Sequence, residues 1–350
     1  MANMTGVTAV AERPTDTVRL SSPRIVTAGT KRSGVRATVE PPRLAAGQVD
    51  GLPGAVTDMA LSRDGRHLVA AHYGNDSVSV IDLMTLTVSA TVAGIAEPYA
   101  VAVADRAYVN TASREEDSVV AIDLKAGSTL AAKEITVGAR GLAVSPDGAA
   151  IYLARSGDQV ADIAVIDTES GKTKTITVTR TVDDWVDTVR INADGTRLYA
   201  ALNSDSGGSL VVIDVGARRV LHTIALGGSI GDIAVDRDNR RVLVTGWDDE
   251  RGGVVRVVDG EAGRVVDTLA VDGFPVQVVV RGGSGYLVDG SEVAVIETAT
   301  ATISDRIDAG SPVASIAVSA DGTRLYVADY DGAVTARELS RADRVLRAAS

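Results

Sequence analysis

The sequence predicts an all-β fold, because a unit with the marks of four short strands recurs seven times along the chain. In each unit two apolar runs are followed by a third, which ends on an acidic residue, as in Ile81-Asp82. These acidic positions are 82, 123, 167, 214, 259, 297 and 338, so the spacing runs from 38 to 47 residues. A period of about 40 residues with four strands per unit is typical of a β-propeller. We therefore expect a seven-bladed β-propeller with four antiparallel strands in each blade.

The turn between the first two strands supports this prediction. In the last unit Asp321-Gly322 separates an apolar run at 314–318 from a second run that begins at Leu325-Tyr326. An Asp-Gly pair between apolar runs is a strong hairpin signal, because glycine readily adopts the positive φ of a tight turn. The same pair recurs as Asp64-Gly65, Asp147-Gly148 and Asp194-Gly195. We interpret these aspartates, and those that end the third strands, as turn residues that cap their own backbone.

The first strand of each unit is built from small residues, which suits the narrow axis of a propeller. One aligned position carries Ala60, Ala102, Ala143, Ala234 and Ala317. The alignment gives Arg190 and Gln277 at this position in the fourth and sixth units. A guanidinium on the innermost strand needs a partner, because burying a charge unpaired is costly. Arg190 could bind an anion together with Arg140, or pair with Asp187 or an acid of the neighbouring blade.

The chain divides into an N-terminal extension at 1–50 and the propeller at 51–350. The extension is rich in Thr, Ser, Pro and Arg and carries a charge of +3, against −14 for the rest. Such a segment is expected to be largely flexible, with one possible added strand at Val35 to Glu40. We expect Asp343 to Ala348 to close the last blade as its fourth strand. The alternative is that an N-terminal strand closes the ring.

Composition excludes several classes of function. There is no cysteine, only three histidines, and the net charge is −11. A nucleic-acid partner is therefore unlikely, since phosphate binding depends on clustered Lys and Arg. No apolar run approaches the roughly 20 residues of a membrane span, and no signal peptide is visible. We expect a cytoplasmic monomer without cofactor or metal; export by a leaderless route is the alternative.

The second strands carry a further repeated motif. It reads Leu325-Tyr-Val-Ala328, Leu198-Tyr-Ala-Ala201, Ile151-Tyr-Leu-Ala154 and Ala107-Tyr-Val-Asn110, and each leads towards an acidic third-strand ending. Over about residues 54 to 345 this pattern resembles the YVTN-type, quinoprotein-amine-dehydrogenase-like repeats of bacterial seven-bladed propellers. The resemblance implies a propeller fold. Its implications for function are broad, since the family includes extracytoplasmic and surface-layer proteins, dehydrogenase subunits and one DNA-binding protein.

Aromatic residues indicate where a site could lie. Of only eleven, five tyrosines (108, 152, 199, 286 and 326) occupy the second-strand framework position and are expected in the core. The other six fall in loop segments that the alignment sends to one mouth of the central channel. They could simply plug the channel, or they could bind a partner, because aromatic anchors concentrate at interfaces. The candidate ligand-binding residues are Tyr73, Tyr99, Arg140, Arg155, Trp185, Asp187, Arg190, Trp247, Phe274 and Tyr330.

We predict a non-enzymatic binding or scaffold module that presents this mouth to a peptide, a protein or a small polar ligand. The alternative is a lactonase-like propeller hydrolase or lyase acting at the same mouth. Its catalytic residues would be His72, Arg140 and Asp187, since histidine titrates near neutrality and can act as a base. Acidic pairs such as Asp183-Asp184 do not have the spacing of a calcium loop, so no metal site is predicted.

Overall fold

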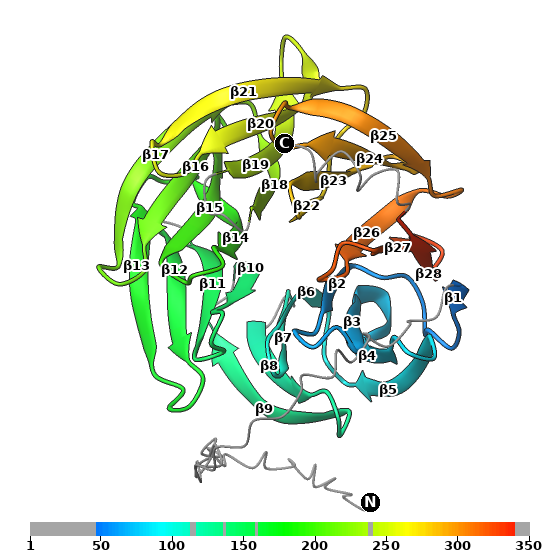
Figure 1. Cartoon of the computed structure of the whole chain (residues 1–350). Coiled ribbons are helices and arrows are strands. Elements are labelled where there is room, and N and C mark those ends of the chain that lie inside the picture. The colour runs from blue at the N-terminus through cyan, green and yellow to red at the C-terminus, as the bar shows by residue number, and fades with distance from the viewer. Residues whose placement is uncertain (1–46, 113–116, 136–137, 158–159, 237–240, 340–350) are drawn as a thin grey trace, which may run out of the picture.

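Seven antiparallel four-stranded sheets stand around a central axis (Figure 1). This computed structural model describes residues 47–112, 117–135, 138–157, 160–236 and 241–339. Within these residues the single helical element is a 3-10 turn, η1 (Tyr73–Asn75). The predicted seven-bladed β-propeller with four antiparallel strands per blade is confirmed.

Each blade runs outward from the axis in chain order. Blade 1 contains β2 (Asp58–Leu61), β3 (His67–His72), β4 (Ser77–Asp82) and β5 (Thr87–Ala93). Blade 2 contains β6 (Pro98–Val103), β7 (Ala107–Thr111), β8 (Asp117–Asp123) and β9 (Ser128–Ile135). Blade 3 contains β10 (Ala139–Val144), β11 (Ala150–Gly157), β12 (Val160–Asp167) and β13 (Thr173–Thr179). Blade 4 contains β14 (Trp185–Ile191), β15 (Arg197–Ser204), β16 (Gly207–Asp214) and β17 (Arg219–Gly227).

The remaining blades follow the same order, except at the ring closure. Blade 5 contains β18 (Ile230–Val235), β19 (Arg241–Asp248), β20 (Gly252–Asp259) and β21 (Arg264–Val271). Blade 6 contains β22 (Val278–Arg281), β23 (Ser284–Asp289), β24 (Glu292–Glu297) and β25 (Thr302–Asp308). Blade 7 contains β26 (Val313–Val318), β27 (Arg324–Asp329), β28 (Val334–Glu338) and, as its outermost strand, β1 (Gly47–Val49).

The repeated acidic residues act as predicted. All seven third strands end on the acid that marks the repeat, from Asp82 in β4 to Glu338 in β28. The Oδ1 atom of Asp82 accepts a hydrogen bond from the backbone N–H of Met84 at 2.7 Å, which fixes the turn into β5. In the turn between β2 and β3 of blade 1, Gly65 has a φ of 67°, the left-handed conformation that favours glycine.

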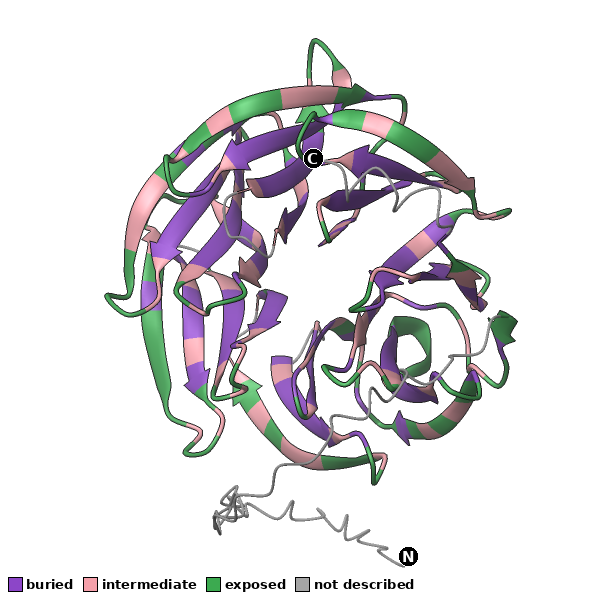
Figure 2. Cartoon of the chain, viewed as in Figure 1, coloured by how far each residue is buried: buried purple, intermediate pink, exposed green. Residues whose placement is uncertain are grey.

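The core consists of seven apolar clusters, each shared by two adjacent blades. Figure 2 shows the inner three strands of the blades as mostly buried, while the outermost strands alternate between exposed and intermediate. The inner strands are covered on both faces, which explains their nearly continuous apolar runs. The five framework tyrosines are no more than 4% exposed, as predicted.

An N-terminal strand closes the ring. Figure 1 shows β1, in blue, beside the red β28, and the register pairs Val49 with Val334. The expected closure by Asp343 to Ala348 was wrong, because β1 occupies the fourth-strand position; those residues and the possible strand at Val35 to Glu40 lie outside the described part. The propeller thus begins at Gly47, within the predicted extension. Val49 is buried in the cluster between blades 7 and 1.

This closure makes truncation a direct test. Deleting residues 1–46 leaves β1 intact, so the melting temperature should change little. Deleting 1–49 removes Val49 from the core and exposes the edge of β28, which is a template for aggregation. We expect the longer deletion to lower the melting temperature by roughly 5–10 °C, equivalent to the loss of a few kcal/mol in a domain of this size. Thermal unfolding and light scattering of both variants provide the measurement, and equal melting temperatures would contradict the role of β1.

Candidate functional site

One face of the ring collects two sets of loops. These are the loops that join strand two to strand three within a blade and those that lead from one blade to the next. Because the strands are antiparallel, both sets lie at the end where the first strands begin. We call the described parts of these loops the mouth face: 50–57, 73–76, 94–97, 112, 138, 180–184, 205–206, 228–229, 249–251, 272–277, 290–291, 309–312 and 330–333.

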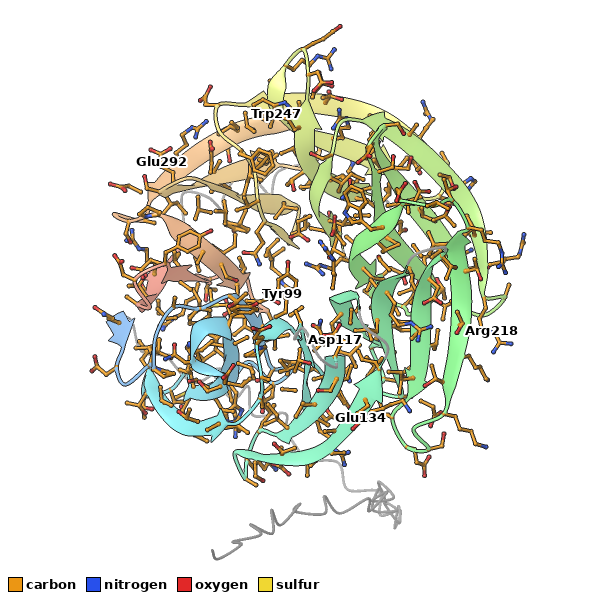
Figure 3. The ribbon with its side chains drawn as sticks, turned by 180° about the vertical axis from the view of Figure 1, so that it is seen from behind. Tyr99, Asp117, Glu134, Arg218, Trp247 and Glu292 are labelled. Carbon is orange, nitrogen blue, oxygen red and sulfur yellow. The ribbon has the colours of Figure 1, made fainter. Side chains whose placement is uncertain are left out.

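Aromatic side chains are exposed on the mouth face and at the strand ends beside it. Their exposed fractions are 41% for Tyr73, 41% for Tyr99, 39% for Trp247, 53% for Phe274 and 62% for Tyr330. Figure 3 shows Tyr99 beside the central opening and Trp247 farther out on the ring. Large apolar side chains gathered on an exposed surface are typical of interaction sites. All five side chains are therefore accessible to solvent and to a ligand.

Two of these aromatic side chains form a pair between adjacent blades. The ring centroids of Trp247 in blade 5 and Phe274 in blade 6 lie 5.9 Å apart, with the planes at 26°. A Cβ atom added to Gly252 would lie 3.7 Å from the indole, so the indole packs over the start of β20. The pair therefore presents a supported aromatic surface whose outer side faces solvent.

The structure brings Arg140, Trp185 and Asp187 together. One carboxylate oxygen of Asp187 accepts hydrogen bonds from Trp185 Nε1 and Asn203 Nδ2, each at 2.7 Å. The other oxygen pairs with Arg140 Nη1 at 3.1 Å. Because 55% of the Arg140 side chain is exposed, the guanidinium can still meet a ligand from solvent.

A hollow of about 410 Å³ lies beside Trp185. It is lined by Ser156 and Gly157 from blade 3 and by Asp183, Asp184, Trp185 and Asp205 from blade 4. An indole next to three carboxylates is the kind of environment that accepts a cationic group. Within the described residues, no group of three or more His, Asp and Glu is arranged to hold a metal ion.

Arg155 is held by an internal ion pair. Its Nε and Nη2 atoms donate to both carboxylate oxygens of Asp162, at 2.8 and 3.0 Å, across the β11–β12 ladder. This bidentate geometry is the strongest arrangement for an arginine and a carboxylate. The side chain of Arg155 therefore stabilises blade 3 through this ion pair.

Arg190 pairs with an acid of the neighbouring blade, one of the two alternatives considered from the sequence. Its Nη2 atom lies 2.7 Å from Oδ1 of Asp232, and its Nη1 atom donates to Thr188 Oγ1 at 2.8 Å. Asp232 is buried, and burial raises the pKa of its carboxyl although Arg190 acts against this. Arg190 thus joins blades 4 and 5 near the axis.

The sequence alignment of blade 6 was wrong by two residues. Tyr286 pairs with Val279, so Val279, and not Gln277, occupies the small-residue position. Phe274 is displaced in the same way, and Val276 takes the place assigned to it. Gln277 instead lies two positions before the small residue, where blades 1 and 5 carry Asp58 and Asp232.

These three side chains accept hydrogen bonds from the innermost strand of the next blade, and we call them the inter-blade acceptors. The donors and distances are Val101 N to Asp58 at 2.9 Å, Val278 N to Asp232 at 3.1 Å, and Ile316 N to Gln277 at 2.7 Å. Sequence reasoning missed Asp58 and Asp232. A polar residue recurring two positions before the small residue was the signal available.

His72 does not present a catalytic base at the mouth. It is fully buried; its Nδ1 atom lies 3.0 and 3.2 Å from the carbonyl oxygens of Gly54 and Ala55, and its Nε2 atom lies 2.9 Å from Ser79 Oγ. Two carbonyl acceptors place the proton on Nδ1, so Nε2 accepts from the serine. Burial lowers the pKa of the imidazole. The neutral imidazole therefore has a structural role: its hydrogen bonds connect β3 to the loop before β2.

The fold is that of a seven-bladed β-propeller whose mouth face exposes aromatic side chains. The chain is 32% identical over 320 residues to the seven-bladed β-propeller protein Rv1057 of Mycobacterium tuberculosis, with 81% of each chain covered. The chain belongs to the family of seven-bladed β-propeller proteins that this relative represents. No family model matches the chain. None of the helical structure in the described residues is long and apolar enough to cross a membrane.

Two solved structures share the fold. A chain of Kuenenia stuttgartiensis hydrazine synthase superposes with a TM-score of 0.73 at 21% identity, covering 88% of this chain and 99% of that chain. The β-propeller domain of Myceliophteria thermophila Cps50 (Swd1) gives a TM-score of 0.70 at 14% identity, covering 86% and 100%. At these identities the likeness shows the fold alone.

Arg140 and Arg190 allow a matched stability test. Arg190→Ala leaves the carboxylate of Asp232 buried without its cation, so we expect the free energy of unfolding to fall by about 2–3 kcal/mol, discounted for the partial exposure of Arg190. Arg140→Ala breaks an exposed pair and should cost about 0–1 kcal/mol. Urea unfolding of both variants measures the difference, and equal losses would contradict the structural role of Arg190.

The buried carboxylate of Asp58 predicts a pH dependence of stability. Burial raises its pKa from 3.8 to about 6, although the hydrogen bond from Val101 and the charge of Arg190 lower it. The folded protein therefore binds a proton that the unfolded chain does not bind between about pH 6 and pH 4. Stability contributed by Asp58 should increase as the pH falls through this window. Measured against Asp58→Asn, wild-type unfolding free energy should rise from pH 7 to pH 5, and a pH-independent difference would contradict this.

Proposed function

We propose that the protein is a binding module that docks a basic, extended polypeptide segment on its mouth face. The observation that carries this proposal is a set of exposed aromatic side chains within an acidic surface. Aromatic rings provide apolar contact and cation–π attraction, and carboxylates provide charge complementarity. Lysine- and arginine-rich segments offer the matching chemistry.

The charge of the two faces supports a basic partner. The described loops of the mouth face contain ten acidic and two basic residues, whereas the described loops of the opposite face contain eight and six. The acidic excess is therefore concentrated on the side that carries the aromatic residues. Arginines at the adjoining strand ends are paired within the protein, as Arg306 is with Asp272, Asp289 and Glu292.

The two tryptophans offer two kinds of contact for such a segment. Trp247 and Phe274 provide an apolar surface, and the hollow beside Trp185 can receive the end of a basic side chain. The rigid propeller holds both in place before binding, which reduces the entropy lost on association. The hydrolase or lyase alternative lacks support from the geometry, because the base assigned to it, His72, is buried and hydrogen-bonded through both nitrogens.

We also infer that the repeats are of the YVTN type. The Tyr-containing second strands and the acidic ends of the third strands support this assignment. Cytoplasmic location and a monomeric state remain predictions.

Intrinsic fluorescence gives a direct test, because both tryptophans of the chain lie at the mouth. A short peptide of alternating arginine and glycine should change the emission of the full chain, with an affinity that falls between about 50 and about 500 mM salt. A glutamate–glycine peptide of the same length should have no effect. Trp247→Ala and Phe274→Ala should each raise Kd about tenfold, the effect expected of an aromatic hot spot.

Val266 provides the control for these variants, since it is 41% exposed but lies on the outermost strand β21. Val266→Ala should leave the affinity unchanged. Binding that is equally weakened by Val266→Ala, or a peptide response independent of charge, would overturn the proposal. Variant affinities are measured by calorimetry wherever Trp247 is removed.

A further inference from the structure

A second cavity lies at the opposite end of the central channel. Its volume is about 220 Å³, and turn and strand-end residues from blades 1, 2, 3, 6 and 7 line it. The apolar part of the wall comes from the last residues of the innermost strands, among them Leu61, Val103 and Val318. A water molecule occupies about 30 Å³ in the liquid, so the cavity has room for a small organic ion.

The wall contains a buried hydroxyl group with no assigned role. Tyr326 is 0% exposed and lines this cavity, and its hydroxyl has no hydrogen-bond partner in the described part of the chain. Within the described residues, none of the other four framework tyrosines has a buried hydroxyl without a hydrogen-bond partner. Burial raises the pKa of Tyr326 to about 12, so the phenol keeps its proton at neutral pH and can donate it. A buried donor of this kind favours a ligand with an oxygen acceptor.

The charged residues of the wall are both cations. Arg63 and Arg281 line the cavity, and its wall includes no Asp or Glu. Three aspartates of the surrounding turns are held within those turns. Ser62 Oγ donates to Asp64, Ser145 Oγ to Asp147 and Ser319 Oγ to Asp321, each at 2.6 Å. In a chain with a net charge of −11, the charged residues of the wall itself are thus two arginines, and these three carboxylates accept hydrogen bonds from serines of the wall.

The position of Arg281 links the cavity to the neighbouring turn. A Cβ atom added to Gly322 would lie 3.8 Å from Cγ of Arg281, so the arginine stem passes over the Asp321-Gly322 turn of blade 7. Gly322 has a φ of 67° and suits this conformation. Blades 6 and 7 thus contribute Arg281 and Tyr326 to the wall of the same cavity.

We propose that this cavity binds a small oxyanion, a carboxylate or a phosphate, with Tyr326 donating a hydrogen bond and Arg63 and Arg281 supplying positive charge. Each of the three groups is a donor, which matches a ligand that carries only acceptors. The site uses no residue of the mouth face and does not depend on the function proposed there.

The test uses the full chain with acetate, succinate and inorganic phosphate as separate probes, at an ionic strength held constant with sodium chloride. At least one probe should raise the melting temperature above that in chloride alone, and calorimetry should give its Kd. Arg63→Gln and Tyr326→Phe should each raise that Kd at least tenfold. A response to phosphate alone or to the carboxylates alone would identify which oxyanion the site takes.

Two controls separate binding from altered folding. Arg218→Gln removes a cation on the same face but in blade 4 (Figure 3), and Tyr152→Phe changes a framework tyrosine that does not line the cavity. Both should bind the probe as the wild type does. In buffer without probe, Tyr326→Phe should melt at the same temperature or higher, because it removes an unpaired buried hydroxyl. Absence of any probe effect beyond chloride, or equal Kd values in all four variants, would overturn the proposal.

Discussion

The ring depends on joining seven sheets that share no backbone ladder with one another. Each blade pairs its strands internally, so adjacent blades are joined mainly through side chains, with isolated backbone contacts such as the hydrogen bond from Val313 N–H to the carbonyl oxygen of Gly290 at 2.9 Å. Seven apolar clusters fill the spaces between blades, and the inter-blade acceptors Asp58, Asp232 and Gln277 add hydrogen bonds between innermost strands. The closing joint differs in one respect, because β1 brings the start of the described chain into the last blade. There Val49 packs in the same cluster as Tyr326.

The taper towards the axis determines where a ligand can bind. Innermost strands approach closely, and the polar groups they carry are used to connect blades, as the pair Arg190–Asp232 shows. The ends of the channel are less constrained, because loops and turns there face solvent. Both candidate sites lie at these ends, and the rigid blades hold their side chains in place.

The repeat made the fold predictable. The candidate site was less predictable, because it lies where the blades depart from the repeat. The framework tyrosines and the acidic ends of third strands have the same local reason in every blade, so the sequence identified them correctly. Gln277 and Phe274 were misplaced because the turn between β22 and β23 is two residues shorter than the repeat suggested: Val279 pairs with Tyr286 seven residues on, whereas Ala60 pairs with Val69 nine residues on. His72 was taken for a mouth residue because its partners Gly54 and Ser79 are set by tertiary contacts. The strand β1 has three residues and no apolar periodicity, so only the open edge of β28 identifies it.

The two ends of the channel have different charge for different physical reasons. On the face opposite the mouth, aspartates recur because each one fixes a turn, and the serine that precedes it by two positions holds its carboxylate in place. Their number therefore follows from the fold. The mouth-face loops differ from blade to blade, and Trp247, Phe274 and Tyr330 have no counterpart that the repeat requires. Exposing these side chains costs solubility, although Trp247 and Phe274 stack on each other. The partner proposed above, by covering these side chains, would account for their exposure.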